Sequence, residues 1–189
     1  MSDNHKIADL VLIQIKALYA STLAKIQLAP DVTNSQKDLS LVTRDVLIPT
    51  VGMAGEGDVF QHPQKIEFNN TIQAIHHNGG LNFKFETIDG KVSEHPGCTY
   101  AFKKAEITPK ETQITKIQVW YYTDYISGFK LFSNDAVVLE AGGFSNEMKE
   151  VTLEVGERLL GIKSKIYDKA PHVNSAAHCN LSLVIGKLA

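Results

Sequence analysis

The chain has 189 residues, of which 43% are hydrophobic and 21% charged, and its formal net charge is −2. This composition is typical of one globular domain, or of one domain with an extension, that is large enough to bury a core. It argues against a dedicated nucleic-acid-binding protein, which usually carries an excess of basic residues.

The N-terminal residues predict an amphipathic helix over residues 4 to 28. Apolar side chains recur there at the three- and four-residue spacing of one helix face, and Pro30 ends the pattern. They are Ile7, Leu10, Val11, Ile15, Leu18, Leu23 and Ile26. Two roles are open for this helix: it caps an end of the following domain, or it docks on another protein.

Polar residues such as Lys6, Asp9 and Lys16 interrupt this apolar stretch. It is therefore too polar for a membrane-spanning helix, and it lacks the basic start and the small-residue cleavage site of a signal peptide. We therefore predict a cytoplasmic protein without a membrane span. In that reducing compartment Cys98 and Cys179 are expected as free thiols, although the sequence leaves their pairing open.

A polar linker, "DVTNSQKD", follows the helix. After it the pattern predicts a strand at Leu41 to Leu47 and then a loop rich in glycine. The rhythm of the sequence changes to regular strands at about residue 65. We therefore predict an N-terminal helical extension and linker over residues 1 to 64, and a β domain over residues 65 to 189.

Ten segments of this β domain have the composition of strands, and turn signals such as "NGG", "DGK", "HPG" and "SND" separate them. They cover residues 65–68, 71–77, 81–88, 99–107, 115–122, 126–132, 136–142, 150–155, 158–167 and 180–186. A spacing near ten residues is typical of an antiparallel sandwich, barrel or prism. The predicted fold class is therefore mainly β.

Three stretches of the C-terminal part carry a more specific pattern: "ITKIQVWYYTDYISGFKLFSNDA", "VTLEVGERLLGIKSK" and "HCNLSLVIGKL". Their order resembles that of jacalin-related lectins, whose domains carry I-x-x-I-x-V, I-x-G-[IF], G-E-x-[IL]-x-G-[IV] and then x-L-x-[LF]. The resemblance covers residues 114 to 189. It implies an antiparallel β-prism-like (jacalin-like) domain, in which three sheets pack around one core, preceded here by the N-terminal amphipathic helix.

In that family, loop amides and an aspartate that closes a G-x-x-x-D motif bind a sugar at one end of the prism. Aligned on the last strand, Ser175 and Cys179 stand where the glycine and the aspartate would be, and a shift of one residue places Asn180 at the aspartate position. Two glycine pairs, Gly79–Gly80 and Gly142–Gly143, both match the glycine-rich sugar loop. The candidate ligand-binding residues are Gly142, Gly143, Asn174, Ser175, Cys179 and Asn180.

The departure from G-x-x-x-D leaves two functions open. The resemblance implies a lectin-like module that binds carbohydrate or a glycoprotein. The alternative is a structural or assembly subunit that has lost the sugar site and contacts other proteins through the β domain and the N-terminal helix. Homo-oligomerisation stays open under both hypotheses.

The residues that could carry chemistry favour a non-catalytic protein. His95, Cys98, His178 and Cys179 would suit zinc if they met in space, but the usual C-x-x-C and H-x-x-x-H spacings are absent. The sequence also lacks a nucleophile motif such as G-x-S-x-G. We therefore predict no catalytic residue, no metal and no cofactor.

The densest aromatic cluster lies at residues 120 to 125. Strand alternation sends Trp120 and Tyr122 to one face and Tyr121 to the other. Two interpretations are open. In the first, one set fills the core and the other covers a sheet face. In the second, the outward set forms an exposed platform for a sugar ring or a protein.

Overall fold

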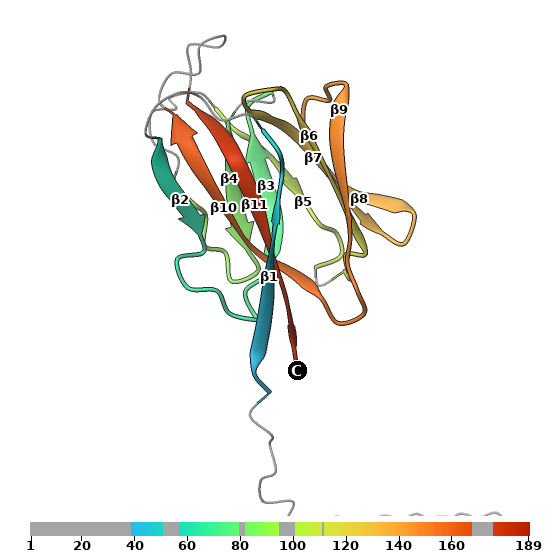
Figure 1. Ribbon diagram of the computed structural model, residues 1–189. Helices are drawn as coiled ribbons and strands as arrows, with labels where there is room; N and C mark the ends of the chain where they lie inside the picture. Colours follow the sequence, from blue (N-terminus) through green and yellow to red (C-terminus); the bar gives the residue numbers. More distant parts are fainter. Residues whose placement is uncertain (1–38, 51–56, 80–81, 95–100, 111, 168–175) are drawn as a thin grey trace, which may run out of the picture. The chain divides into compact units, whose positions relative to one another are not determined.

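A computed structural model describes residues 39–50, 57–79, 82–94, 101–110, 112–167 and 176–189 of the chain (Figure 1). The chain divides into two units, Met1–Leu39 and Ser40–Ala189. All described strands belong to the second unit. The predicted helix over residues 4 to 28 lies outside the described residues.

The second unit is built from strands, and its described residues form eleven of them. They are β1 (Leu41–Leu47), β2 (Asp58–His62), β3 (Ile72–His77), β4 (Phe83–Thr87), β5 (Lys103–Glu106), β6 (Lys116–Tyr121), β7 (Ile126–Ser133), β8 (Ala136–Gly142), β9 (Glu147–Thr152), β10 (Arg158–Tyr167) and β11 (Ala177–Leu188). No helix of the described residues is long and apolar enough to cross a membrane.

These strands form three sheets, and every pairing within them is antiparallel. Sheet A has the strand order β1-β11-β10-β2, sheet B has β4-β3-β5, and sheet C has β8-β7-β6-β9. Figure 1 shows the strands of all three sheets running lengthwise through the unit, so that their connections gather at two ends. We call the end at which β3, β6 and β10 begin the base, and the end at which they finish the upper end.

The mainly β, antiparallel fold expected from the sequence is confirmed, and several strand limits agree closely. The strands at Leu41–Leu47, Ala136–Gly142 and Arg158–Tyr167 have the predicted bounds. Residues 65–68 are not a strand, because this stretch leads into a turn in which the Asn70 amide donates to the Glu67 carbonyl.

The β unit begins at Ser40, ahead of the predicted boundary at residue 64. The reason is the pairing of two early strands. β1 pairs with β11 along its whole length, and β2 pairs with β10. Both strands therefore complete sheet A and are not part of an extension.

One hydrophobic core joins the three sheets. Strand alternation turns Ile117 and Val119 of β6 inward, where both are fully buried, while Gln118 between them faces outward. The ring of Phe129 in sheet C lies edge-on to Phe83 and Phe85 in sheet B, with centroids 5.0 and 5.6 Å apart. Burial of each such side chain contributes about 1.5–3 kcal/mol, so this contact is a major stabiliser of the fold.

A part-buried ion pair connects β1 at the edge of sheet A with the loop that follows β9 of sheet C. Arg44 of β1 donates from Nε and Nη2 to the two carboxylate oxygens of Glu157, at 2.8 Å each, and from Nη2 to the Thr152 carbonyl of β9 at 3.3 Å. The Glu154 amide donates to the same carboxylate at 2.8 Å. Glu157 is therefore satisfied on both oxygens although its side chain is only 5% exposed.

Candidate functional site

The predicted glycine loop lies at the upper end, where the last residue of β8, Gly142, pairs with Gly128 of β7. Gly142 has a φ of +92°, and a Cβ there would stand 2.4 Å from the Ser127 carbonyl oxygen. A Cβ on Gly128 would stand 2.2 Å from the Gly143 carbonyl oxygen. The Gly143 amide donates to Ser127 at 2.8 Å. Close backbone packing thus explains why glycine stands at these positions, and it uses the Gly143 amide within the fold.

Two of the predicted ligand residues, Cys179 and Asn180, lie on β11, and both take part in the fold. Cys179 is fully buried, and burial raises the pKa of its thiol to about 12, so its side chain is not accessible to a ligand in solution. Asn180 has a φ of +48° and donates its backbone amide to Thr50 Oγ1 at 2.6 Å. Asn174 and Ser175 lie outside the described residues.

Two of the four candidate zinc ligands, His178 and Cys179, also lie on β11. His178 is fully buried; its Nε2 donates to the Phe83 carbonyl at 3.0 Å, and its Nδ1 lies 2.8 Å from Ser164 Oγ. Both ring nitrogens therefore contact other polar groups of the core. Within the described ranges, no three histidine, cysteine or carboxylate side chains could hold one metal ion, and His95 and Cys98 lie outside those ranges.

The aromatic cluster divides between the two faces of sheet C. Tyr121 packs against the core, while Trp120 lies on the outer face with its ring 4.8 Å from that of Phe144. Lys130 Nζ lies 4.3 Å from the Phe144 centroid and 5.4 Å from that of Trp120. Tyr122 is 48% exposed and contacts Tyr125. The predicted alternation of Trp120 and Tyr121 is therefore confirmed.

A pocket of about 410 Å³ opens at the base of the unit. We call it the base pocket, and its residues come from the segments around β3, after β4, before β6 and at the start of β10. Leu159, which lines it, stands near the first residue of β10, whereas Cys179 pairs with Lys165 near the last. Because strands rise by about 3.3 Å per residue, the base pocket and the predicted β11 site are roughly 20 Å apart.

The floor of the base pocket is aliphatic. Ile72, Ile107, Ile114 and Leu159 are buried members of the hydrophobic core, and each also lines the pocket. Beside them, Gln73 donates Nε2 to the Ile107 carbonyl at 2.6 Å, so its amide is fixed between β3 and the segment after β5. The floor is therefore part of the hydrophobic core.

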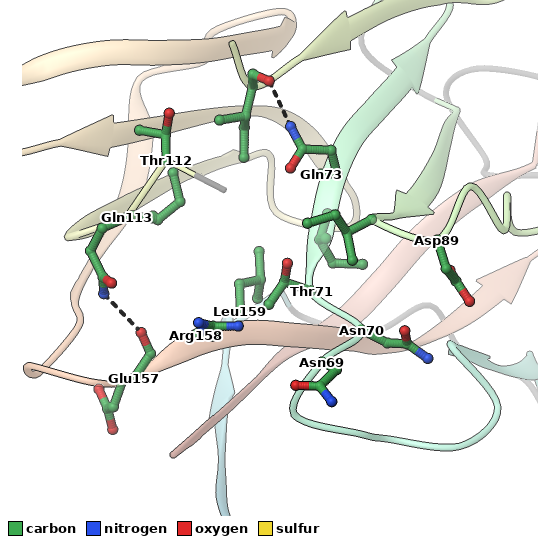
Figure 2. Close-up of a pocket in the computed structure, with 14 residues that line it drawn as sticks. Asn69, Asn70, Thr71, Gln73, Asp89, Thr112, Gln113, Glu157, Arg158 and Leu159 are labelled. Carbon is green, nitrogen blue, oxygen red and sulfur yellow. Dashed lines mark hydrogen bonds between the residues drawn. The ribbon is translucent and has the colours of Figure 1, made fainter. Parts of the chain in front are cut away.

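The walls of the base pocket carry uncharged polar groups (Figure 2). Asn69, Asn70 and Thr71 come from the turn before β3, and Thr112 and Gln113 come from the segment before β6. Thr112 Oγ1 donates to the Pro109 carbonyl at 2.6 Å, and Gln113 Nε2 donates to the Glu157 carbonyl at 3.3 Å. The Thr112 hydroxyl and the Gln113 carbonyl keep acceptor capacity toward a ligand.

Both carboxylates of the pocket are held ionised by bound donors. The hydrogen bonds from Arg44 lower the pKa of Glu157 to about 2, with a further contribution from the Glu154 amide. Hydrogen bonds from Lys91 and Thr87 lower the pKa of Asp89 to about 2. Each carboxylate is thus paired with a cation of its own.

Arg158 is the remaining charged residue of the pocket lining. Its guanidinium lies over the ring of Phe68, with Cζ 4.5 Å from the centroid. It forms no ion pair with any residue that the structure describes. The base pocket therefore carries one uncompensated positive charge.

Sequence reasoning did not find the base pocket. Its lining residues are separated by up to 90 positions, from Asn69 to Leu159. The only local signal is the polar run Asn69–Asn70–Thr71 directly before an apolar strand, and such runs are also typical of ordinary turns.

No protein-family model and no curated protein sequence matches the chain. Solved structures of jacalin-related lectins do match its fold. A mannose-binding jacalin-related lectin from Ananas comosus is 14% identical, with a TM-score of 0.49 over 79% of this chain and 99% of that one. The Calystegia sepium agglutinin is 15% identical, with a TM-score of 0.47 over 77% and 98%. Single-chain recombinant jacalin is 11% identical, with a TM-score of 0.46 over 80% and 99%. The predicted resemblance is thus confirmed, and it extends beyond residues 114 to 189.

Proposed function

We propose that this chain is a lectin-like module that binds carbohydrate without catalysis, on three sheets arranged as a β-prism. The observation that carries the proposal is the base pocket, in which amides and hydroxyls stand over an aliphatic floor. Its volume of about 410 Å³ lies within the range of small-molecule sites, roughly 300–1,000 Å³, and suits one sugar ring.

The chemistry of a sugar ring fits these walls. Each hydroxyl both donates and accepts a hydrogen bond, and amide side chains such as Asn70 and Gln113 offer both a donor and an acceptor. The carbon-bound hydrogens on a ring face form an apolar surface, which Ile72 and Leu159 on the floor would contact. A ligand that is polar at its edge and apolar on its face is the class that this lining favours.

The state of the two carboxylates supports binding without catalysis. A general acid must hold a proton near neutral pH, and a good general base has a pKa near that pH. The cations beside Glu157 and Asp89 lower both pKa values to about 2. Neither group is therefore suited to move a proton to or from a bound ligand.

The sequence-predicted ligand residues Gly142, Gly143, Asn174, Ser175 and Asn180 stay a prediction for carbohydrate binding, whereas the buried side chain of Cys179 is not accessible to a ligand. A cytoplasmic location likewise stays a proposal from the sequence.

The alternative function, a structural or assembly subunit, is favoured by the outer face of sheet C. Phe144 and Met148 are 41% and 40% exposed there, beside Trp120, and exposed apolar side chains that gather on one face are typical of protein contacts.

A titration with simple sugars tests the proposal. Replacement of both wall amides, by Asn70→Ala with Gln113→Ala, is expected to weaken sugar binding by about thirtyfold, because each of the two lost hydrogen bonds costs about 1 kcal/mol. Gln118→Ala is the matched control, since Gln118 is on the outer face of sheet C and bonds Glu150. The proposal fails if a screen of sugars finds none that binds, or if the double variant binds as tightly as the control.

A further inference from the structure

We infer that the carbohydrate taken by the base pocket carries a carboxylate, as a uronate does, and that Arg158 binds this group. The inference rests on the proposed function and names its ligand class. Its basis is the charge of the lining, in which Arg158 is the one cation without an anionic partner among the described residues.

The neighbouring charges are already balanced in pairs. Glu157 is bound by Arg44 with N–O distances of 2.8 Å, and Asp89 is bound by Lys91 at 2.7 Å. A ligand carboxylate at Arg158 would therefore meet one guanidinium whose charge is not shared with a protein carboxylate. The side chains of Arg44, Glu157, Lys91, Asp89 and Arg158 together carry a net charge of +1, and a bound ligand carboxylate would neutralise it.

The orientation of Arg158 suits a planar acid. Its guanidinium is placed by the Phe68 ring, 4.5 Å from Cζ, and a stacked guanidinium keeps its N–H groups at the edge of its plane. That edge can form two parallel hydrogen bonds to one carboxylate. Because no lysine is among the described residues that line the pocket, the lining offers this one fork and lacks the several cations that commonly surround a phosphate.

The rest of the lining accounts for the sugar part of such a ligand. In the view of Figure 2, Arg158 lies between Glu157 and Thr71, with Gln113 on the same side of the pocket. A carboxylate held by Arg158 would leave the ring hydroxyls within the space bounded by the uncharged Thr71 and Gln113 side chains. The acid fixes one end of the ligand, and the amides and hydroxyls bind the other.

The test compares three probes by isothermal titration calorimetry on the full chain: D-glucuronate, D-glucose and acetate. Glucuronate is expected to bind about tenfold more tightly than glucose, as a hydrogen-bonded charge pair allows, and to weaken as the salt concentration rises. Acetate alone is expected to bind more weakly than glucuronate, because it makes no contact with the amide walls.

Two variants locate the effect. Arg158→Gln is expected to reduce glucuronate affinity to that of glucose. Lys149→Gln removes the same charge from exposed β9, outside the pocket lining, and is expected to change neither affinity. Thermal melting of each variant shows that the comparison is between folded proteins.

The outcomes separate the two claims. Equal affinity for glucuronate and glucose, or a preference that survives Arg158→Gln, would overturn the inference and leave the proposed function standing. Acetate that binds as tightly as glucuronate would keep the Arg158 anion site and overturn the carbohydrate function. Binding of no probe would overturn the inference, and the screen of other sugars would then decide the proposed function.

Discussion

The Arg44–Glu157 pair predicts a specific dependence of stability on pH. The pair joins β1 to the loop before β10, and its bonds hold the pKa of Glu157 at about 2, against 4.5 for the unperturbed group. A shift of one unit corresponds to about 1.4 kcal/mol, so the pair is worth about 2–3 kcal/mol after a discount for solvent screening of the partly exposed Arg44. Glu157→Gln is expected to remove this amount at pH 7.

The direction in which stability changes with pH follows from the difference in proton binding between the folded and the unfolded chain. Because the folded-state pKa of Glu157 is lowered, the unfolded chain binds more protons between about pH 4.5 and pH 2. The stabilisation is thus complete above the unfolded pKa and is lost as the pH falls toward the folded one. The difference in unfolding free energy between wild type and Glu157→Gln should therefore be constant from pH 7 to about pH 5 and shrink below that.

The assay is urea denaturation at a series of pH values, followed by the fluorescence of Trp120, the single tryptophan of the chain. Glu154→Gln is the matched control, because Glu154 is 68% exposed in its pair with Lys187 and should contribute under about 0.5 kcal/mol. A Glu157→Gln difference that stays the same from pH 7 to pH 2.5, or that equals the control at pH 7, would contradict this prediction.

Three further predictions concern the upper end and the core. Gly142→Ala is expected to destabilise the fold by about 2–4 kcal/mol, because its Cβ would stand 2.4 Å from a carbonyl oxygen. Gly156→Ala, at a φ of +83° in open space, is expected to destabilise it by about 1 kcal/mol. Equal losses in melting temperature for the two variants would contradict this. Cys179, whose thiol pKa burial raises to about 12, should resist iodoacetamide at pH 8 until urea unfolds the protein, and mass spectrometry of the labelled peptide would disprove this by finding rapid native-state modification. His178→Phe should cost about 2–4 kcal/mol in urea denaturation, because it leaves two buried hydrogen-bond partners unsatisfied, and a loss below about 0.5 kcal/mol would show that they find other partners.

Local patterns in the sequence were enough for most strands but not for their partners. Strand-like composition and the turn signals between segments located β8 and β10 to the residue. It did not show that β1 pairs with β11, because a pairing between the first and the last strand of a unit leaves no local pattern. Without this pairing, the strand at Leu41–Leu47 is assigned to the N-terminal extension, and the domain boundary is therefore predicted at residue 64.

The candidate site was harder to predict for the same physical reason. Arg44 and Glu157 are 113 positions apart, and no short motif connects them. At the upper end, alignment placed Cys179 at a ligand position. The β10–β11 pairing shifts register between Lys163 and Lys165, and Asn180, opposite that shift, takes a left-handed conformation while Cys179 stays in the interior. A local irregularity of this kind cannot be read from residue types alone.

The most direct test of carbohydrate binding in the base pocket is a map of amide chemical shifts during a titration with glucuronate. We expect the largest changes at Asn70, Thr71, Gln113 and Arg158, which line the pocket. Changes confined to the upper end, around Gly143 and Asn180, or no change at a saturating concentration of the sugar, would contradict it.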